Sequence, residues 1–221
     1  MGTQMENAWH AAQRAFQIEA DALAGMAGAI SEESFRRAVT ALARAPRIAA
    51  SGCGHSGIAC RHFAHLMCCI ERPARFLSPS EALHGGMGFL QKGDAMLLAS
   101  RGGRTGELIP MLDICRKKGV TVLAVTENLH SPLAAGADIV LPFLVPCETD
   151  RFNSQGTTSF VVLAALFDAL QTALIELTGY QNAQFALIHP GGAVGERLNR
   201  GKSEGKEVDF HVEETNRGFR F

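Results

Sequence analysis

An alternation of short apolar segments with helical segments constrains the fold of this chain more than any other feature. The apolar segments lie at residues 47–52, 74–77, 94–100, 120–125 and 139–143, with helical patterns between them at 56–70, 106–118 and 131–135. Short apolar runs are typical of strands buried on both faces. Strands that alternate with helices favour a parallel sheet with right-handed crossovers. We therefore predict an α/β fold, a five-stranded parallel sheet between two layers of helices.

Helical patterns also flank this region. Residues 1–45 predict two helices, because small and apolar residues recur at helical spacing from Trp9 to Met26 and a start signal, SEES, begins at Ser31. A pattern over 157–177 with almost no charge predicts a helix buried in the core or against another subunit. We predict N-terminal helices at 1–45 that pack on the domain or a partner subunit, one domain at 46–200, and a tail at 201–221 that is extended or disordered.

Composition excludes several classes of protein. The 221 residues hold 21 Lys+Arg against 22 Asp+Glu, a balance that argues against nucleic-acid binding. The apolar runs are too short to cross a bilayer and the first residues lack a secretory signal, so we expect no membrane contact and a cytoplasmic location. The spacing of the six cysteines does not suggest a disulfide framework, and we expect free thiols.

A cluster of cysteines and histidines suggests zinc as an alternative. Cys60 and Cys68 lie about two turns apart on the predicted helix, however, and the paired C-x2-C spacing of zinc ligands is missing. We interpret the cysteines as structural and predict no metal. The cluster consists of Cys60, His62, His65, Cys68 and Cys69.

Three polar loops are the candidates for a binding site. They are SGCGHSG at residues 51–57, SRGGRTGE at 100–107 and NSQGTTS at 153–159. In an open parallel sheet, ligands bind at the carboxyl ends of the strands. Each loop supplies backbone N–H groups or hydroxyls before a helix N-terminus, which suits a phosphate. Arg101 and Arg104 add donors for a phosphate or carboxylate, although a solvated surface pair is the competing interpretation.

The first loop also spells the dinucleotide fingerprint G-x-G-x-x-G, with glycines at 52, 54 and 57. A ribose-binding acid is expected about twenty residues further on, where the chain instead reads FLSP from Phe76. A nicotinamide or flavin enzyme therefore remains the weaker alternative.

Four motifs together resemble the sugar isomerase (SIS) domain, and within it the arabinose 5-phosphate isomerase group. They are GCGHSG from Gly52, EALHGGMG from Glu81, SRGGRTGEL from Ser100 and FALIHPGGAVG from Phe185, so the resemblance covers most of the chain. It implies a flavodoxin-like sheet, a homo-oligomer (dimer or tetramer), a phosphosugar ligand near a subunit boundary and no organic cofactor.

The resemblance also implies residue roles. Glu107 matches a glutamate implicated in isomerisation, His189 matches the family histidine, and Glu148 lies near a second family glutamate. His55 and His84 complete the catalytic candidates. A carboxylate can move a proton between C1 and C2 of the sugar through a cis-enediol while histidine serves the oxygens. The candidate phosphate contacts are Ser56, Ser100, Arg101, Arg104, Thr105, Ser154, Thr157 and Thr158.

Three departures from the family pattern bear on function. His55 stands where the family has lysine, and SRGGRT replaces SNSGES, which removes a hydroxyl and adds two cations. We also expect the paired CBS domains, with their nucleotide sensing, to be absent.

We predict an isomerase for a pentose 5-phosphate such as arabinose 5-phosphate or ribulose 5-phosphate. The alternatives are an isomerase for another phosphosugar, a phosphosugar-binding protein without catalysis, and a metal-assisted isomerase that uses His55, His84 and His189.

Overall fold

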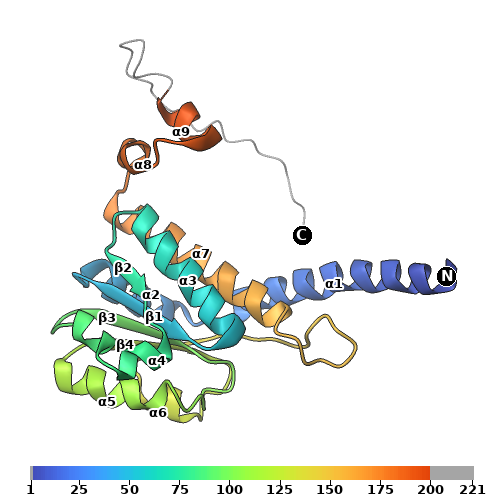
Figure 1. Cartoon of the computed structure of the whole chain (residues 1–221), viewed down its shortest axis with the longest axis horizontal. Helices are drawn as coiled ribbons and strands as arrows, with labels where there is room; N and C mark the ends of the chain where they lie inside the picture. The colour runs from blue at the N-terminus through green and yellow to red at the C-terminus, as the bar shows by residue number, and fades with distance from the viewer. Residues whose placement is uncertain (1, 200–221) are drawn as a thin grey trace. The chain divides into compact units, whose positions relative to one another are not determined.

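The computed structural model describes residues 2–199, which fall into two compact units (Figure 1). The first unit ends at Gly179 and the second starts at Tyr180. This boundary lies inside the single domain that the sequence predicts at 46–200. The predicted tail at 201–221 lies outside the described residues.

The first unit is built on a five-stranded parallel sheet. Its strands are β1 (Ile48–Gly52), β2 (Ala74–Phe76), β3 (Ala95–Ala99), β4 (Thr121–Thr126) and β5 (Ile139–Pro142), in the order β2-β1-β3-β4-β5. This is the flavodoxin-like order, as predicted. Gly52 pairs with Ala99, and Ala99 with Val125. The loops that follow β1, β3 and β4 therefore leave the sheet at one edge.

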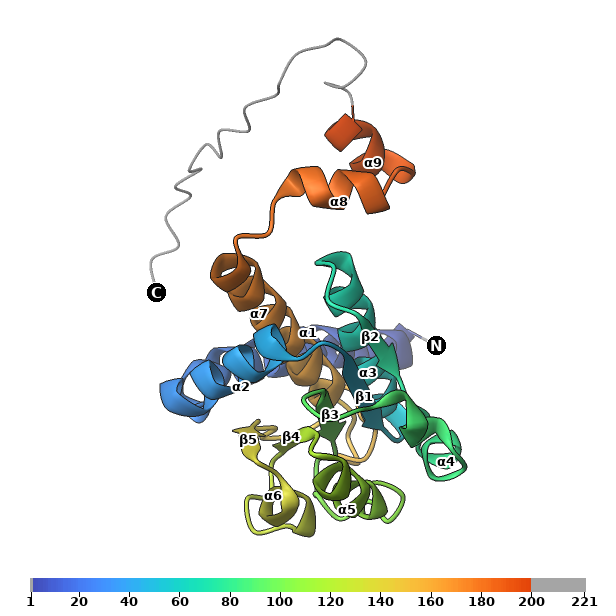
Figure 2. The same ribbon diagram turned by 90° about the vertical axis from the view of Figure 1, so that its left-hand side faces the viewer.

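Helices cover both faces of the sheet and confirm the three-layer prediction (Figure 2). One layer holds α2 (Glu32–Arg44), α3 (Gly54–Cys69) and α7 (Thr158–Thr178); the other holds α4 (Pro79–Leu83), α5 (Ile109–Lys118) and α6 (Pro132–Gly136). Met96 and Leu98 of β3 join Met111 in the core beneath α5. Leu97 between them is also fully buried, because alternate strand residues point to opposite faces.

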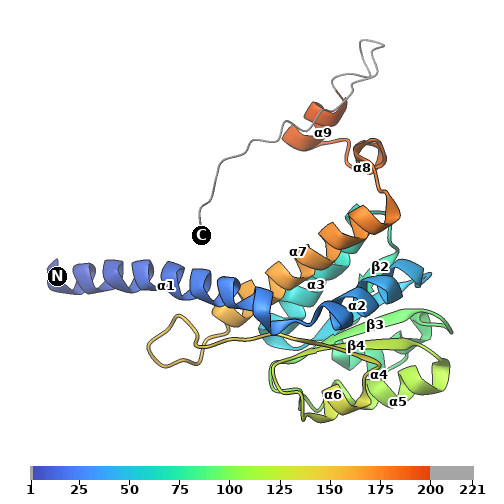
Figure 3. The same cartoon turned by 180° about the vertical axis from the view of Figure 1, so that it is seen from behind.

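The two N-terminal helices are present as predicted. Ser31 caps α2 by accepting the N–H of Ser34 at 3.1 Å, which confirms the start signal. Before it, α1 (Gly2–Ala29) contacts α7 and buries Ala22, and its N-terminal end projects beyond the helical layer (Figure 3).

The apolar sequence of α7 reflects its packing. By length and composition alone it could cross a membrane, but core helices of soluble proteins meet the same test. Its buried residues include Leu163, Leu166 and Leu170, and the Phe167 ring lies 5.0 Å from that of Phe63 on α3. The helix packs against α1, α2 and α3, but only 33% of its apolar stretch is buried within this chain, so the predicted burial is confirmed on one side of the helix only.

Two local features differ from the sequence prediction. Helix α5 begins at Ile109 rather than near Gly106, because residues 101–108 form turns in which Gly103 has a φ of +64°. Helix α4 and the 3-10 helix η1 (Gly86–Phe89) follow β2, where no element is predicted.

The second unit contains α8 (Asn182–Ile188) and α9 (Gly192–Asn199). A Cβ at Gly195 would come within 2.5 Å of the His189 carbonyl oxygen, so glycine permits the tight turn between the helices. Asn199 joins the two helices by donating to the Ala186 carbonyl of α8 at 3.4 Å, and it also donates to the Gly195 carbonyl of its own helix at 2.8 Å.

Candidate active site

A cleft of about 570 Å³ opens at the carboxyl end of β1. The loop between β1 and α3 forms one wall, and the segment after β2, with Ser78 and Ser80, forms another. Glu107 lines the same cleft. Its position at the sheet edge is where the sequence predicts ligand binding.

Glycine shapes the β1–α3 loop. A Cβ on Gly57 would lie 2.5 Å from the Gly52 carbonyl oxygen, and Gly54 has a φ of +55°. The loop turns tightly enough to bring the N-terminus of α3 to the cleft, where unpaired N–H groups and the helix dipole favour an anion. The loop therefore meets the physical requirement for a phosphate site.

The loop after β3 brings two predicted phosphate contacts together. Ser100 Oγ and Thr105 Oγ1 share a hydrogen bond of 2.8 Å, and the Gly103 N–H donates to Ser100 Oγ at 3.1 Å. A Cβ on Gly103 would collide with Ser131, so this turn also requires glycine. Arg104 is exposed beside Thr105.

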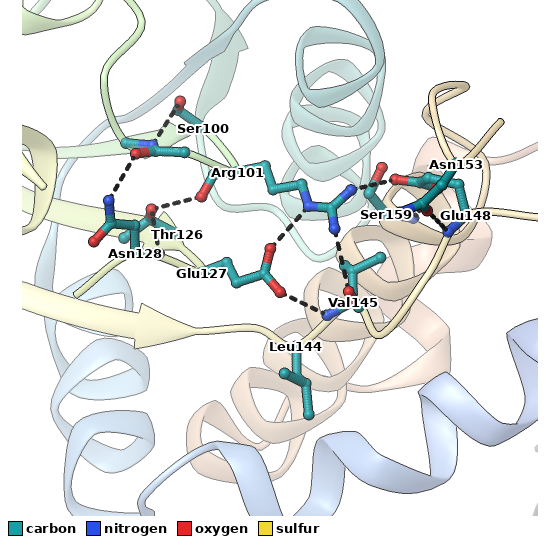
Figure 4. Close-up of polar contacts among 12 residues, drawn as sticks. Ser100, Arg101, Thr126, Glu127, Asn128, Leu144, Val145, Glu148, Asn153 and Ser159 are labelled. Atoms are coloured by element: carbon teal, nitrogen blue, oxygen red, sulfur yellow. Dashed lines mark hydrogen bonds and ion pairs between the residues drawn. The ribbon is translucent and has the colours of Figure 1, made fainter. Parts of the chain in front are cut away.

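Arg101 points into the protein (Figure 4). Its Nε donates to Glu127 at 2.8 Å, its Nη1 to Glu148 at 2.7 Å and its Nη2 to the Val145 carbonyl at 3.2 Å. The sequence predicts Arg101 as a phosphate contact; the geometry instead favours a role in holding the loop after β3 against the segment that leads to α7.

Glu148 is buried at the N-terminus of α7. Its Oε2 accepts the Ser159 N–H at 3.1 Å and the Thr157 hydroxyl at 3.3 Å, while Oε1 pairs with Arg101. A buried carboxylate at a helix N-terminus stabilises the helix through its N–H groups and its dipole. The predicted catalytic carboxylate is thus engaged in capping α7.

The three predicted phosphate contacts of the third loop, Ser154, Thr157 and Thr158, differ in burial and in hydrogen bonding. Thr158 is fully buried, and its hydroxyl has no hydrogen-bond partner among the described residues. Thr157 Oγ1 accepts the Thr149 N–H at 3.0 Å, and Ser154 is exposed. A phosphate contact by these three hydroxyls stays a prediction, with Ser154 the most open of them.

Two observations concern the catalytic candidates His55 and Glu107, which both line the cleft. The His55 ring packs so closely on Gly156 that a Cβ there would lie 2.7 Å from Nδ1, which joins the first loop to the third. Burial, and then the charge of Glu107, raise the pKa of the Cys53 thiol. Glu107 and Cys53 therefore lie close enough to interact across the cleft wall.

Three candidates remain, Ser56, His84 and His189. Ser56 is half-buried in the first turn of α3. His84 ends α4, is exposed and does not line the cleft. His189 belongs to the second unit, where its ring lies 4.9 Å from that of Phe185, so its place in the site stays a prediction.

Sequence reasoning did not select several residues of the cleft, four of which carry polar or thiol side chains. Cys53, Arg61, Ser78 and Ser80 all line it, and the Arg61 guanidinium lies 4.1 Å from the centre of the Phe76 ring. The signal for the serines was available, because SPS begins two residues after the end of β2 and lies at the same sheet edge as the three chosen loops.

The suspected zinc cluster is explained by packing. Cys60 is fully buried and donates to the Ser51 carbonyl, and Cys68 donates to the Ala74 carbonyl, each at 3.3 Å. Within residues 2–199 no group of three or more His, Cys, Asp or Glu side chains could hold a metal ion.

Comparison with known proteins identifies the family to which this chain belongs. The SIS domain family matches residues 41–173. The chain belongs to the SIS domain family. A Listeria monocytogenes structure described as a candidate sugar-phosphate isomerase is 41% identical, with a TM-score of 0.82 over 84% of this chain and 98% of that one.

Arabinose 5-phosphate appears in the names of two further similar proteins. An Escherichia coli CFT073 protein solved in complex with arabinose 5-phosphate is 28% identical, with a TM-score of 0.78 over 84% of this chain and 98% of that one. The arabinose 5-phosphate isomerase KdsD of Pseudomonas aeruginosa is 35% identical over 86% of this chain and 58% of its own length. The chain thus spans little more than half the length of this relative.

Proposed function

We propose that this SIS protein is an aldose–ketose isomerase that acts on a pentose 5-phosphate such as arabinose 5-phosphate or ribulose 5-phosphate. One observation carries the proposal: Glu107 lines the same cleft as the N-terminus of α3 and lies two residues from Thr105, whose hydroxyl is bonded to that of Ser100. A carboxylate beside an anion-binding edge is the arrangement that this reaction needs. The names of the KdsD relative and of the Listeria structure support the same chemistry.

In the proposed complex, hydroxyls and N–H groups hold the phosphate and leave the carbonyl end at Glu107. Ser100, Thr105 and the first turn of α3 supply the neutral donors, and exposed Arg104 supplies the cation. Because Arg101 is already paired with two glutamates, Arg104 is the arginine more available to pair with the phosphate.

In the proposed proton transfer Glu107 acts as the base. Its carboxylate removes the proton from C2 of the aldose, the C1 oxygen gains a proton to give the cis-enediol, and the O2 proton leaves as Glu107 returns its proton to C1. His55, at the cleft, is proposed to serve the hydroxyl oxygens. A contribution from His189 to ring opening is part of the same proposal.

The test is isomerisation in deuterated water. We expect arabinose 5-phosphate and ribulose 5-phosphate to interconvert with deuterium incorporated at the carbon next to the carbonyl. Glu107→Gln should lower kcat by at least about 100-fold, since a general base contributes factors of this size. Glu176→Gln, on the exposed side of α7, is the matched control and should retain full activity.

Binding without turnover is the second candidate. The observation in its favour is the engagement of Glu148 by Arg101, Thr157 and Ser159, which leaves Glu107 as the open carboxylate of the two. Thermal stabilisation by arabinose 5-phosphate with no deuterium incorporation would identify a binding protein and reject the isomerase.

A further inference from the structure

The cleft contains a cation that the proposed mechanism does not use. Of the described residues that line the cleft, Arg61 is the one Lys or Arg, as Glu107 is the one carboxylate. Arg61 is exposed on α3, and within residues 2–199 it forms no hydrogen bond or ion pair. Its guanidinium is therefore available to pair with an anionic group on a ligand through charge-assisted hydrogen bonds.

An aromatic ring holds the Arg61 guanidinium in place. Phe76 ends β2, and a Cβ on Gly57 would lie 3.7 Å from Cζ of its ring, so the ring packs on the first turns of α3. Cζ of Arg61 lies over this ring, 4.1 Å from its centre. Such a cation–π contact stabilises the guanidinium and leaves the N–H groups at its edge open to a bidentate partner. The cation is thus fixed at the wall of the cleft before a ligand binds.

Two hydroxyls line the cleft next to Phe76. Ser78 Oγ and Ser80 Oγ share a hydrogen bond of 3.0 Å. Ser78 is the N-cap residue of α4, but its side chain makes no capping hydrogen bond. Each hydroxyl has one donor and two acceptor sites, so both retain hydrogen-bonding capacity for a ligand. We call Arg61, Ser78 and Ser80 the β2-side subsite.

The strand order separates this subsite from Glu107. Ser78 and Ser80 follow β2, which lies on one side of β1. Glu107 follows β3 on the other side of β1, as does Ser100, whose hydroxyl is proposed to hold the phosphate. Neighbouring strands lie about 4.8 Å apart, so two spacings place roughly 10 Å between the two ends of the cleft.

A phosphosugar with an acidic group at each end matches this separation. In a pentose 1,5-bisphosphate eight bonds join the two phosphorus atoms, and at roughly 1.2 Å per bond an extended chain places them about 10 Å apart. With one phosphate at the loop after β3, the other reaches the β2-side subsite. A pentose with a single phosphate has no group that pairs with Arg61 in this arrangement.

We propose that the β2-side subsite binds a second oxyanion, phosphate or carboxylate, on a phosphosugar whose first phosphate is held by the loop after β3. This inference rests on the proposed phosphosugar site. A sugar whose C1 hydroxyl is esterified to phosphate, or whose C1 is a carboxylate, cannot complete isomerisation through the cis-enediol. The subsite therefore recognises ligands that occupy the cleft without turnover and compete with the substrate.

Calorimetric titration with three probes that cannot be isomerised tests the subsite. Ribitol 5-phosphate carries one acidic group, ribulose 1,5-bisphosphate adds a phosphate at C1, and 5-phosphoribonate has a carboxylate there. We expect at least one two-anion probe to bind about tenfold more tightly than ribitol 5-phosphate, because Arg61 gains charge-assisted hydrogen bonds. The tighter of the two identifies the preferred oxyanion. Equal Kd values for the three probes, or no binding by any of them, would overturn the proposal.

Substitution of Arg61 tests the residue itself. Arg61→Met keeps an apolar side chain on Phe76 but removes the charge, so the preference for the two-anion probe should fall to within about threefold. Arg61→Lys keeps the charge without the planar fork and should retain part of the preference. Because Arg61 is exposed, neither variant should change the circular dichroism spectrum.

Arg75→Met is the matched control. Arg75 is also exposed and its guanidinium also lies over an aromatic ring, 5.1 Å from the centre of Phe89, but it does not line the cleft. This variant should keep the full preference for the two-anion probe. An equal loss in Arg61→Met and Arg75→Met would reject the subsite, because it would reflect net charge alone.

The result is separable from that of the proposed isomerisation. The probes bind without turnover, so a preference that Arg61→Met removes supports the subsite even if no deuterium enters arabinose 5-phosphate. Conversely, isomerisation by a protein that binds all three probes equally would refute the subsite and leave the isomerase standing.

Discussion

Arg101 Nη1 lies 2.7 Å from Glu148 Oε1, a contact between residues 47 positions apart. Glu148 is nearly buried, with its side chain 3% exposed, whereas that of Arg101 is 37% exposed. The pair joins the loop after β3 to the N-terminus of α7, and Glu127 on the same guanidinium adds the end of β4. Three segments at this sheet edge, the loop after β3, the end of β4 and the segment before α7, are thus joined by one guanidinium.

Replacement of Arg101 should destabilise the fold. Arg101→Met leaves the buried Glu148 carboxylate without its counter-ion, which costs about 3 kcal/mol when one partner of such a pair is removed. Urea unfolding should show a lower midpoint with an unchanged slope. The matched control is Arg116→Met, since Arg116 pairs with Asp113 at the surface and should lose less than about 0.5 kcal/mol. Equal losses in the two variants would refute the role given to Arg101.

The charge of Glu107, which lines the same cleft as Cys53, predicts a change in thiol reactivity. Burial and the charge of Glu107 raise the Cys53 pKa, so Glu107→Gln should lower it and shift the pH midpoint of iodoacetamide alkylation downward. Peptide mass spectrometry can follow Cys53 and Cys69 in one experiment. The Cys69 pKa is raised by burial and by Cys68, so its midpoint should not move. An unshifted Cys53 midpoint would show that the charge of Glu107 does not act on the Cys53 thiol.

Gly156→Ala should affect the site more than the fold. The new Cβ would lie 2.7 Å from His55 Nδ1, and the exposed imidazole can move away at little cost. We expect a stability change below about 1 kcal/mol and a fall of at least threefold in kcat/KM, because His55 leaves its position at the cleft. Gly88→Ala, where a Cβ meets no atom within 4 Å, is the control. Unaltered kinetics in Gly156→Ala would remove His55 from the proposed mechanism.

The hydrogen bonds of the Asp150 carboxylate should keep the third loop ordered even at low pH. Its carboxylate accepts the N–H groups of Phe152, Ser154 and Gln155, and these backbone hydrogen bonds, that of Gln155 foremost, lower its pKa below 3.8. Because the folded pKa is depressed, the loop contacts are fully present above pH 3.8 and disappear as pH falls through the folded value.

Hydrogen exchange can measure this dependence. The amides of Ser154 and Gln155 should stay protected at pH 3.8 and lose protection at lower pH. Asp150→Asn should exchange faster at about pH 5, because an amide nitrogen takes the place of one acceptor oxygen. Identical exchange in the variant and the wild type would show that the carboxylate does not order the loop.

Much of the first unit was predictable because its signals are local. Strands β1 and β3 are short apolar runs, and α2 starts at its serine cap, so periodicity and capping chemistry suffice to find them. The prediction of ligand-binding loops at one sheet edge follows from the parallel topology. The short helix α4 was missed because five residues carry too little periodicity.

Local sequence was sufficient for the order of strands and helices along the chain and for the glycine-dependent turns, since each depends on neighbouring residues, whereas the candidate role of Glu107 came from the resemblance to the SIS family. The inward turn of Arg101 and the capping of α7 by Glu148 came from long-range packing alone. Those outcomes depend on Glu127, Val145 and Ser159, which lie far from Arg101 in sequence. A guanidinium close to buried carboxylates gains more from pairing with them than from remaining in water, and this gain exists only once the chain has folded.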